Sequence, residues 1–365
     1  MTIRTTYSFL FLLPLILIAC DEGTTDPQPD DLPPLPGVTI TTTPGATPGM
    51  VLVGYTGQTD SGNFAAVGYE VDGTVAWHYD IDLRIFDVQP QPNGNITVMA
   101  TPRDREGDFH EVDRQGELVR HHRSTRPETG VHELRLLPAG RLLYGIERDT
   151  LDLTGLGGVA GAEVKQCIVE FDTPNGLRTW STRDGMEMAD SYDAPVGAQV
   201  NPYHVNAIEL DTDGKLLISM RNASQIVKVD PETGAVVWRL GGKRNEFTFI
   251  DDPLGGFHRQ HAIRRLPNGN IILFDNGNGH VPPVSRAVEY ALDETAMTAR
   301  MVWEYRDPAL FSAALGFAQR LTTGNTLICY GLIGLIREVT PGGDVVWELK
   351  VDGVELPYRA IKVEE

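Results

Sequence analysis

Three histidines, one arginine and one asparagine have the residue types and the spacing of an anion-binding site. His204 and Asn206 form an H-x-N sequence, and Arg221 follows fifteen residues after the asparagine. His132 and His261 precede two other turns of the same repeated pattern. Arginine offers a planar, permanently charged fork to an anion, while histidine and asparagine add single hydrogen bonds. A neutral imidazole in such a cluster can also be the nucleophile towards a sulfuryl or phosphoryl group.

A zinc centre is the other chemistry that grouped histidines support. Such a centre needs three protein ligands and usually has a carboxylate or a cysteine among the candidates. The five residues include neither, and the guanidinium of Arg221 would repel the cation. We therefore expect an anion site that uses no metal ion and no cofactor.

Repeated turns predict the fold that positions these residues. Short turns between apolar, alternating segments recur at glycines spaced by 45, 46, 74, 55 and 55 residues, namely Gly49, Gly94, Gly140, Gly214, Gly269 and Gly324. Each glycine is followed by a strand-like segment and then by a second hairpin. The five tryptophans all stand near the end of the last strand of a repeat, at Trp77, Trp180, Trp238, Trp303 and Trp347. We expect them to pack the repeats together rather than to contact a ligand.

Six units of four short strands predict an all-β fold, a six-bladed β-propeller of four-stranded antiparallel blades. Closing the sheets into a ring hides their edges, which a single open sheet of that many strands would expose. We expect the ring to close at a terminal blade, through the C-terminal segment YRAIKVEE or the strand at residues 50–55.

The repeat register predicts that the five polar residues meet in the central channel. The first strand of each propeller blade lines the channel, and the position eight residues before the turn glycine holds His132, Asn206 and His261 in blades three to five. His204 lies two residues further out, on the same face because side chains alternate along a strand. Arg221 lies seven residues after its glycine, and a strand rises about 3.3 Å per residue in either direction. We therefore expect one cluster at one mouth of the channel.

Charge and composition exclude several partners. The chain has 365 residues, with 31 Lys and Arg against 50 Asp and Glu, and a formal net charge of −19. Nucleic acids and anionic lipid head groups are bound by clustered cations, so neither is an expected partner. A small anion in a locally basic cavity remains compatible with this charge.

The first twenty residues have the layout of an export signal. An apolar run from Phe9 to Ala19 is too short to span a bilayer and ends at Cys20. The sequence LIAC resembles a bacterial lipobox, in which the acylated cysteine becomes the mature N-terminus; an uncleaved N-terminal anchor is the alternative. Both predict an exported protein that is lipid-anchored or membrane-anchored at the cell envelope, on the periplasmic side of the inner membrane or at the outer membrane.

Three segments are predicted along the chain. Residues 1–20 form the lipoprotein signal peptide, and residues 21–47, rich in Pro, Thr and Asp, form a disordered linker that is too polar to pack. Residues 48–365 form the propeller, which we expect to be the catalytic domain. Its two cysteines, Cys167 and Cys329, could pair in an oxidising compartment, but we expect two separate buried thiols.

About residues 130–350 resemble the bacterial arylsulfotransferases (aryl-sulfate sulfotransferases). The specific parts are the H-x-N sequence at His204, the S-x-R-N-x-S strand end around Arg221, and the run QHAIRRLPNGN that contains His261. Proteins of this family are exported six-bladed propellers that move a sulfuryl group between phenols without a nucleotide donor. The resemblance therefore implies an aryl sulfate donor and a phenolic acceptor.

The resemblance also implies a role for each residue of the cluster. His261 matches the transiently sulfated histidine of the family, and His132 matches its additional histidine in blade three. The matches to the family's transition-state donors are His204, Asn206 and Arg221. The implied mechanism is ping-pong, with a sulfohistidine intermediate. A free imidazole nucleophile predicts a rate that falls as the pH drops through the histidine pKa.

The chain departs from the enterobacterial members of the family. It is shorter, lacks a large N-terminal β domain and has no close cysteine pair, which bears on its substrate range more than on its chemistry. Two other functions fit a propeller. One is a non-catalytic binding or scaffold lipoprotein. The other is a quinoprotein-like dehydrogenase, suggested by the segment VDPETGAVVW, although such enzymes have eight blades and a vicinal cysteine pair.

Overall fold

The computed structural model describes residues 36–57, 65–80, 84–101, 107–138, 140–353 and 355–364. All of them belong to one compact unit, residues 35–365. The predicted signal peptide, Cys20 and the linker up to residue 35 lie outside the described residues. Within the described ranges, no helix is long and apolar enough to cross a membrane.

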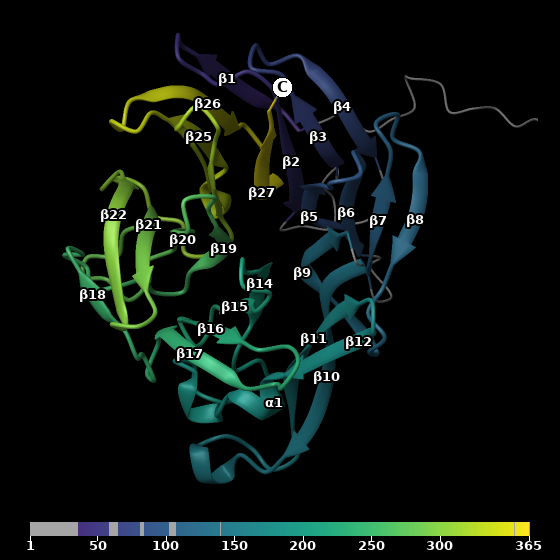
Figure 1. Ribbon diagram of the computed structural model, residues 1–365. Helices are drawn as coiled ribbons and strands as arrows, with labels where there is room; N and C mark the ends of the chain where they lie inside the picture. The colour runs from purple at the N-terminus through teal and green to yellow at the C-terminus, as the bar shows by residue number, and fades with distance from the viewer. Residues whose placement is uncertain are drawn as a thin grey trace, which may run out of the picture. The chain divides into compact units, whose positions relative to one another are not determined.

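Six sheets stand around a central axis, which confirms the predicted six-bladed β-propeller (Figure 1). From the axis outwards, blade one consists of β27 (Glu355–Val363), β2 (Met50–Gly57), β3 (Ala65–Tyr69) and β4 (Val75–Asp80). Blade two consists of β5 (Arg84–Pro90), β6 (Ile96–Thr101), β7 (Asp108–Val112) and β8 (Leu118–His122). Blade three consists of β9 (Glu128–Leu137), β10 (Gly140–Leu151), β11 (Ala162–Thr173) and β12 (Gly176–Ser181). Blade four consists of β14 (Val205–Leu210), β15 (Leu216–Met220), β16 (Gln225–Val229) and β17 (Val236–Gly241). Blade five consists of β19 (His261–Arg265), β20 (Ile271–Asp275), β21 (Arg286–Asp293) and β22 (Thr298–Arg306). Blade six consists of β23 (Phe317–Arg320), β24 (Thr326–Tyr330), β25 (Leu335–Val339) and β26 (Val345–Val351). Six blades do not fit the eight-bladed dehydrogenase alternative.

Strands from both ends of the described chain close the ring. The C-terminal strand β27 is the inner strand of blade one and pairs with β2. Near the other end, β1 (Val38–Thr42) pairs with β26 at the outer edge of blade six. The predicted end of the linker at residue 47 is therefore wrong. The segment VTITT is rich in β-branched residues, which favour strands, and it covers a sheet edge that would otherwise be exposed.

Blade three carries an insertion that explains the long spacing between Gly140 and Gly214. Its strands β10 and β11 have twelve residues each. The short elements around them are η2 (Thr154–Leu156), α1 (Thr182–Gly185), η3 (Met188–Asp190) and β13 (Gln199–Val200). Elsewhere, β18 (Thr248–Ile250) extends the outer edge of blade five, and η4 (Gly331–Ile333) follows β24.

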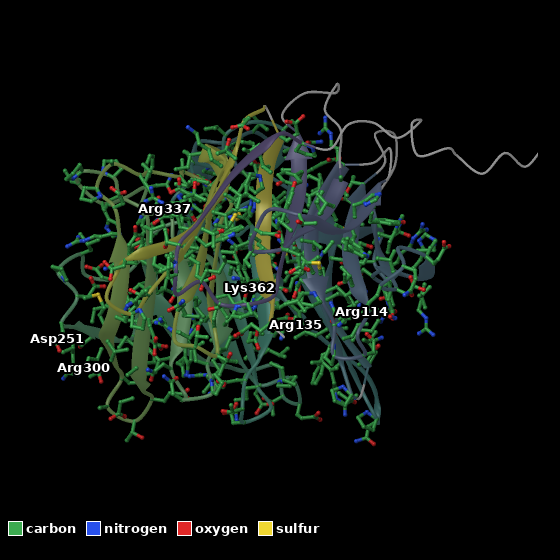
Figure 2. The ribbon with its side chains drawn as sticks, turned by 90° about the horizontal axis from the view of Figure 1, so that it is seen from above. Arg114, Arg135, Asp251, Arg300, Arg337 and Lys362 are labelled. Atoms are coloured by element: carbon green, nitrogen blue, oxygen red, sulfur yellow. The ribbon has the colours of Figure 1, made fainter. Side chains whose placement is uncertain are left out.

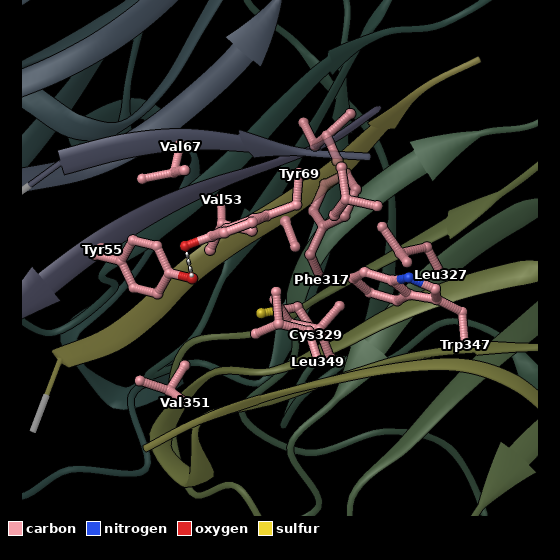
Figure 3. Packing of buried hydrophobic residues seen from close by; sticks show 14 of the residues in the cluster. Val53, Tyr55, Val67, Tyr69, Phe317, Leu327, Cys329, Trp347, Leu349 and Val351 are labelled. Atoms are coloured by element: carbon pink, nitrogen blue, oxygen red, sulfur yellow. Dashed lines mark hydrogen bonds between the residues drawn. The ribbon is translucent and has the colours of Figure 1, made fainter. Parts of the chain in front are cut away.

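Apolar side chains on the blade faces form the core. One cluster joins blades one and six, and its largest fully buried side chain is Trp347 (Figure 3). In the same cluster the hydroxyls of Tyr55 and Tyr69 lie 3.2 Å apart. Three further tryptophans are buried, namely Trp77, Trp180 and Trp238, while Trp303 is half-buried under the guanidinium of Arg320. The tryptophans thus pack the blades.

Charged side chains lie both at the rim and inside the ring. Arg300 and Asp251 form an ion pair at the outer edge (Figure 2). Lys362 on β27 is buried instead, with its Nζ 2.5 Å from the carboxylate of Glu338 and 2.5 Å from the carbonyl of Thr47. These bonds attach the closing strand to blade six and to the segment before β2.

The two cysteines of the propeller are free and buried, as predicted. Cys167 belongs to a cluster of blades three and four, and Cys329 to the cluster of blades one and six. Burial raises the pKa of the Cys167 thiol to about 11 and that of the Cys329 thiol to about 12. Both thiols therefore stay protonated at neutral pH.

Candidate active site

Irregularities in the inner strands direct polar residues into the channel. The pairing of β9 with β10 jumps from Leu134 to Thr129, which leaves His132 in an unpaired stretch. β14 is bulged at Asn206, and β19 is bulged directly after His261. Bulges are frequent beside active sites because the extra residue changes the direction of its neighbours.

His204 reaches the channel by another route than the strand alternation that we predicted. It precedes β14 and has a backbone φ of +54°, in the left-handed region that few non-glycine residues adopt. Its own N–H donates to Oδ1 of Asn201 at 3.1 Å, and the N–H of Arg221 donates to its carbonyl at 3.0 Å. These two bonds hold the strained backbone in place.

The channel brings all five predicted residues together. The ring centroids of His132 and His204 are 5.0 Å apart. The amide of Asn206 donates to the backbone carbonyl that precedes His261, at 2.7 Å. Arg221 and His204 are both among the groups that lower the pKa of His261.

Asn276 determines which nitrogen of His261 carries the proton. The amide nitrogen of Asn276 donates to the carbonyls of Ser312 at 2.7 Å and Leu315 at 2.9 Å. Its Oδ1 therefore points to His261 Nδ1, at 2.6 Å, and can only accept. Nδ1 must carry the hydrogen, so Nε2 of this buried imidazole keeps its lone pair. That is the protonation state of a nucleophile.

The other two histidines have the opposite tautomer. The amide of Asn201 accepts a backbone N–H through Oδ1 and turns its nitrogen towards His204 Nδ1, at 3.5 Å. The hydroxyl of Tyr358 lies 2.5 Å from Nδ1 of His132, and a phenol is the better donor of the two. Both Nδ1 atoms accept, so both Nε2 atoms carry hydrogens and can donate to an anion.

Arg221 is a fixed and uncompensated cation. Its guanidinium donates to the carbonyl of Ala313 at 3.0 Å and to Oδ1 of Asn222 at 3.1 Å, and its buried Nε has no partner. Among the described residues, no carboxylate is within ion-pair distance of it. The neighbouring Arg259 differs, because its guanidinium lies 2.5 Å from the carboxylate of Asp193. An anion that enters the channel therefore meets a free positive charge at Arg221.

Asn206 holds the backbone directly before His261, a function that the sequence did not indicate. One of its amide hydrogens is used by the carbonyl of Gln260, and its Oδ1 is buried without a partner. Gln260 is itself fixed, because its amide donates to Ser219 Oγ at 3.0 Å and to the carbonyl of Gln225 at 3.1 Å. Blade four thus positions His261 at the start of blade five.

Buried ion pairs lie beside the channel histidines. Arg359 lies 2.8 Å from Asp87 and 3.2 Å from Glu133, and Arg264 lies 2.9 Å from Glu133. Arg359 also donates to the backbone carbonyl of His132 at 3.2 Å. The network joins blades one, two, three and five. Neither of its carboxylates is within ion-pair distance of Arg221.

Burial keeps the three imidazoles neutral. Desolvation, with the charge of Arg221 as a further cause, lowers the pKa of His261 to about 3 and that of His204 to about 4. Burial and the neighbouring histidines lower the pKa of His132 well below its usual value. A charged imidazole would lie among cations here, so the neutral forms dominate at physiological pH.

We expect kcat/KM for an aryl sulfate donor to be constant between about pH 5 and pH 8. The sequence alone led us to expect a fall through the ordinary histidine pKa. Because the lowered pKa keeps Nε2 of His261 unprotonated, the nucleophile is lost only as the pH falls towards 3. A pH series with one donor tests this. A fall centred near pH 6.5, the unperturbed histidine value, would contradict it.

A cavity of about 270 Å³ opens beside His132 and His204. Most of its wall is apolar or aromatic, from Phe86, Val131, Tyr144, Ile146, Cys167 and Val205. Half-buried Lys165 also lines it and, within the described ranges, has no carboxylate at ion-pair distance. A cavity of about 150 Å³ can hold benzene, so this one has room for an aromatic ring. Two larger hollows, of about 510 and 780 Å³, do not include the channel histidines.

Three positioning residues were missed from the sequence. Asn276 occupies in blade five the position that Arg221 occupies in blade four, so the register could have indicated it. Tyr358 gave no such signal, because the inner strand of blade one is C-terminal and precedes no turn glycine from which to count. Asn201 lies in the irregular segment before β14.

Fold and site together define a class of protein, namely a six-bladed β-propeller whose channel holds a neutral, buried imidazole close to a fixed guanidinium. The family model of arylsulfotransferase (ASST) matches residues 40–355, and the chain belongs to this family. It is thus an aryl-sulfate sulfotransferase, and aryl sulfates are its substrates, as the sequence motifs implied.

Solved structures of other proteins share the fold. A protein of unknown function from Bacteroides caccae is 15% identical, with a TM-score of 0.51 over 84% of this chain and 94% of that one. The periplasmic gluconolactonase PpgL of Pseudomonas aeruginosa is 14% identical, with a TM-score of 0.51 over 86% of this chain and 99% of that one. At such identities the likeness concerns the fold alone. No curated protein sequence matches the chain.

Proposed function

We propose that this enzyme moves a sulfuryl group from an aryl sulfate to a phenolic acceptor by a ping-pong mechanism, through a sulfohistidine at His261. One observation carries the proposal. Nδ1 of His261 is committed to Asn276, and the opposite, unprotonated nitrogen belongs to a buried imidazole whose pKa is lowered by Arg221. A nucleophile and an anion-binding cation therefore share one site.

In the first half-reaction, Nε2 of His261 attacks sulfur in line with the bond to the aryl oxygen. The N–S bond forms, the S–O bond breaks, and its electron pair leaves with the phenolate. The imidazole becomes positively charged, and Oδ1 of Asn276 stabilises that charge by accepting the Nδ1 hydrogen bond. In the second half-reaction, the acceptor phenol loses its proton to solvent, and its oxygen attacks sulfur while the N–S bond breaks.

Charge stabilisation and positioning supply most of the rate enhancement. A sulfuryl transition state, like that of phosphoryl transfer, is loose and spreads its charge over the equatorial oxygens. We assign Arg221 and the Nε2–H groups of His132 and His204 to these oxygens. Each preorganised donor of this kind contributes about 10²–10³ in kcat. Asn206 acts through the backbone of the nucleophile and adds its second amide hydrogen as a further donor.

Mass analysis after incubation with p-nitrophenyl sulfate alone tests the proposal. We expect the peptide that contains His261 to gain one sulfuryl group and to lose it again when a phenol is added. A single-displacement reaction would give no such intermediate, and initial rates would then not show parallel double-reciprocal lines. A scaffold protein without turnover would release no nitrophenol.

We assign the aryl ring to the cavity beside His132 and His204, and Lys165 to the recognition of acidic substituents on that ring. Burial lowers the pKa of Lys165, with Arg148 as the next cause, so an anionic group would be a favourable partner. Lys165→Met is expected to reduce kcat/KM for 4-carboxyphenyl sulfate by about tenfold or more. The rate with p-nitrophenyl sulfate, which has no acid group, is expected to change little. Equal losses for both donors would contradict this assignment.

The proposed location of the enzyme is the cell envelope, with a lipid anchor on Cys20. Its support is the lipobox-like sequence LIAC after a short apolar run. Cys20→Ala is expected to remove the lipid anchor, so that the protein leaves the membrane fraction for the soluble fraction or accumulates as an uncleaved precursor. Unchanged fractionation, with no labelling of the wild type by a fatty-acid probe, would contradict lipidation.

A further inference from the structure

A second group of histidines lies in blade two, outside the channel. His110 on β7 and His121 on β8 are direct partners in the antiparallel pair, so their side chains share a face of the sheet. Asp108 lies two residues before His110, and side-chain alternation places it on the same face. Antiparallel pairing thus brings two imidazoles and a carboxylate together.

The ligand atoms of this group are close enough to bind one ion. Nε2 of His110 is 3.1 Å from Oδ1 of Asp108, and Nδ1 of His121 is 2.8 Å from Oδ2 of Asp108. All three ligand atoms lie within 4.8 Å of one another. Zinc binds nitrogen and oxygen at about 2.0–2.2 Å, so small side-chain movements would bring all three into contact with one ion. No other group in the described part of the chain meets this condition.

Burial favours ordered coordination at this place. The side chains of Asp108 and His110 are 5% and 7% exposed, while His121 is 49% exposed. The half-exposed imidazole of His121 therefore leaves one side of the buried pair Asp108 and His110 open to solvent.

Tyr79 supplies the outer partner that a metal-bound histidine requires. Its hydroxyl lies 3.0 Å from Nδ1 of His110, on the side of the ring away from Asp108. A histidine that binds a metal through one nitrogen usually donates its other N–H to an oxygen, which fixes the ring. If Nδ1 of His110 donates to Tyr79, then Nε2 faces the Asp108 carboxylate with a lone pair. Two acceptors in that geometry are stabilised by a cation between them.

We propose that Asp108, His110 and His121 form a zinc site with three protein ligands and water in the remaining position. The nearby cation Arg123, whose Nε is 2.9 Å from Oδ2 of Asp108, does not block it, because its side chain is 64% exposed and its charge is screened by solvent. The site is independent of sulfuryl transfer. It joins β7 to β8 and, through Tyr79, blade two to blade one.

Zinc binding to the full-length protein, freed of metal by dialysis against a chelator, tests the proposal. We expect one tightly bound Zn²⁺ per chain and a melting temperature that rises with Zn²⁺. His121→Ala is expected to weaken the binding by at least about 100-fold. This variant should fold, because the side chain is half exposed. Co²⁺ in place of Zn²⁺ should give a visible absorption band that the variant lacks.

His122→Ala is the matched control. His122 is the next residue, but it is buried and its Nε2 lies 2.7 Å from Glu111, outside the proposed ligand set. We expect this variant to bind one Zn²⁺ with unchanged affinity and band. The proposal is overturned if the wild type binds Zn²⁺ no more tightly than His121→Ala, or if His122→Ala loses the ion to the same extent. Transfer from p-nitrophenyl sulfate should persist in all three proteins.

Discussion

Replacing His261 by alanine is expected to reduce sulfuryl transfer from p-nitrophenyl sulfate by at least about 10⁴-fold, because the nucleophile is removed and no other side chain replaces it. His132 and His204 cannot substitute, since their Nε2 atoms carry hydrogens in the tautomers that Tyr358 and Asn201 favour. Initial rates of nitrophenol release, together with mass analysis of the intact protein, measure the effect. The variant should show no sulfated species.

The fold of the His261→Ala variant should survive. The substitution leaves Oδ1 of Asn276 without its partner, which costs about 1–3 kcal/mol. His122→Ala is the matched control, because it also removes a buried imidazole that is bonded to one side chain, Glu111. We expect similar thermal unfolding for the two variants and full activity in the control alone. Activity of His261→Ala within tenfold of the wild type would contradict the role of His261 as the nucleophile. Loss of activity in an unfolded variant would assign the loss to misfolding instead.

The fold could be predicted because turn chemistry repeats along the chain. Glycines such as Gly94, Gly214 and Gly269 have positive φ at tight turns, and tryptophans such as Trp238 and Trp347 are buried at one place in the blade. Both are local consequences of a repeated unit. The strand β1 at the outer edge of blade six was not predicted, because its pairing with β26 joins residues about 300 positions apart and depends on the completed ring.

The residues of the site could be predicted from the sequence, but the hydrogen bonds that fix the tautomer of each histidine could not. Counting from the turns found His132, Asn206 and His261, since bulges displace these residues without removing them from the channel. Tautomers depend on hydrogen-bond partners, namely Asn276 of the same blade for His261 and Tyr358 of blade one for His132, and counting residues from the turns does not assign these donor and acceptor roles. The sequence also does not reveal how deeply the histidines are buried. This burial shifts the expected loss of activity from the ordinary histidine pKa to a lower pH.

These partners also explain why the three histidines of the channel carry their hydrogens on different ring nitrogens. Each imidazole has one nitrogen occupied by a fixed group, and the identity of that group decides whether the other nitrogen donates or attacks. An acceptor, Asn276 Oδ1, leaves a lone pair on Nε2 of His261, whereas donors leave Nε2–H groups on His132 and His204. Their neutrality follows from burial beside Arg221 and Arg359.

Arg221→Lys is expected to lower kcat by about 10²-fold or more, although the charge is kept. The guanidinium is fixed by Ala313 and Asn222, which leaves further N–H groups of its planar fork for an anion, whereas a lysine ammonium is a single flexible point charge. Arg259→Lys is the matched control, because that guanidinium is already paired with Asp193 and should affect kcat less than tenfold. Steady-state rates with p-nitrophenyl sulfate and a saturating phenol separate the two. Equal losses in both variants would contradict a role that is specific to Arg221, whereas full activity in Arg221→Lys would show that positive charge alone, rather than a fork, stabilises the transition state.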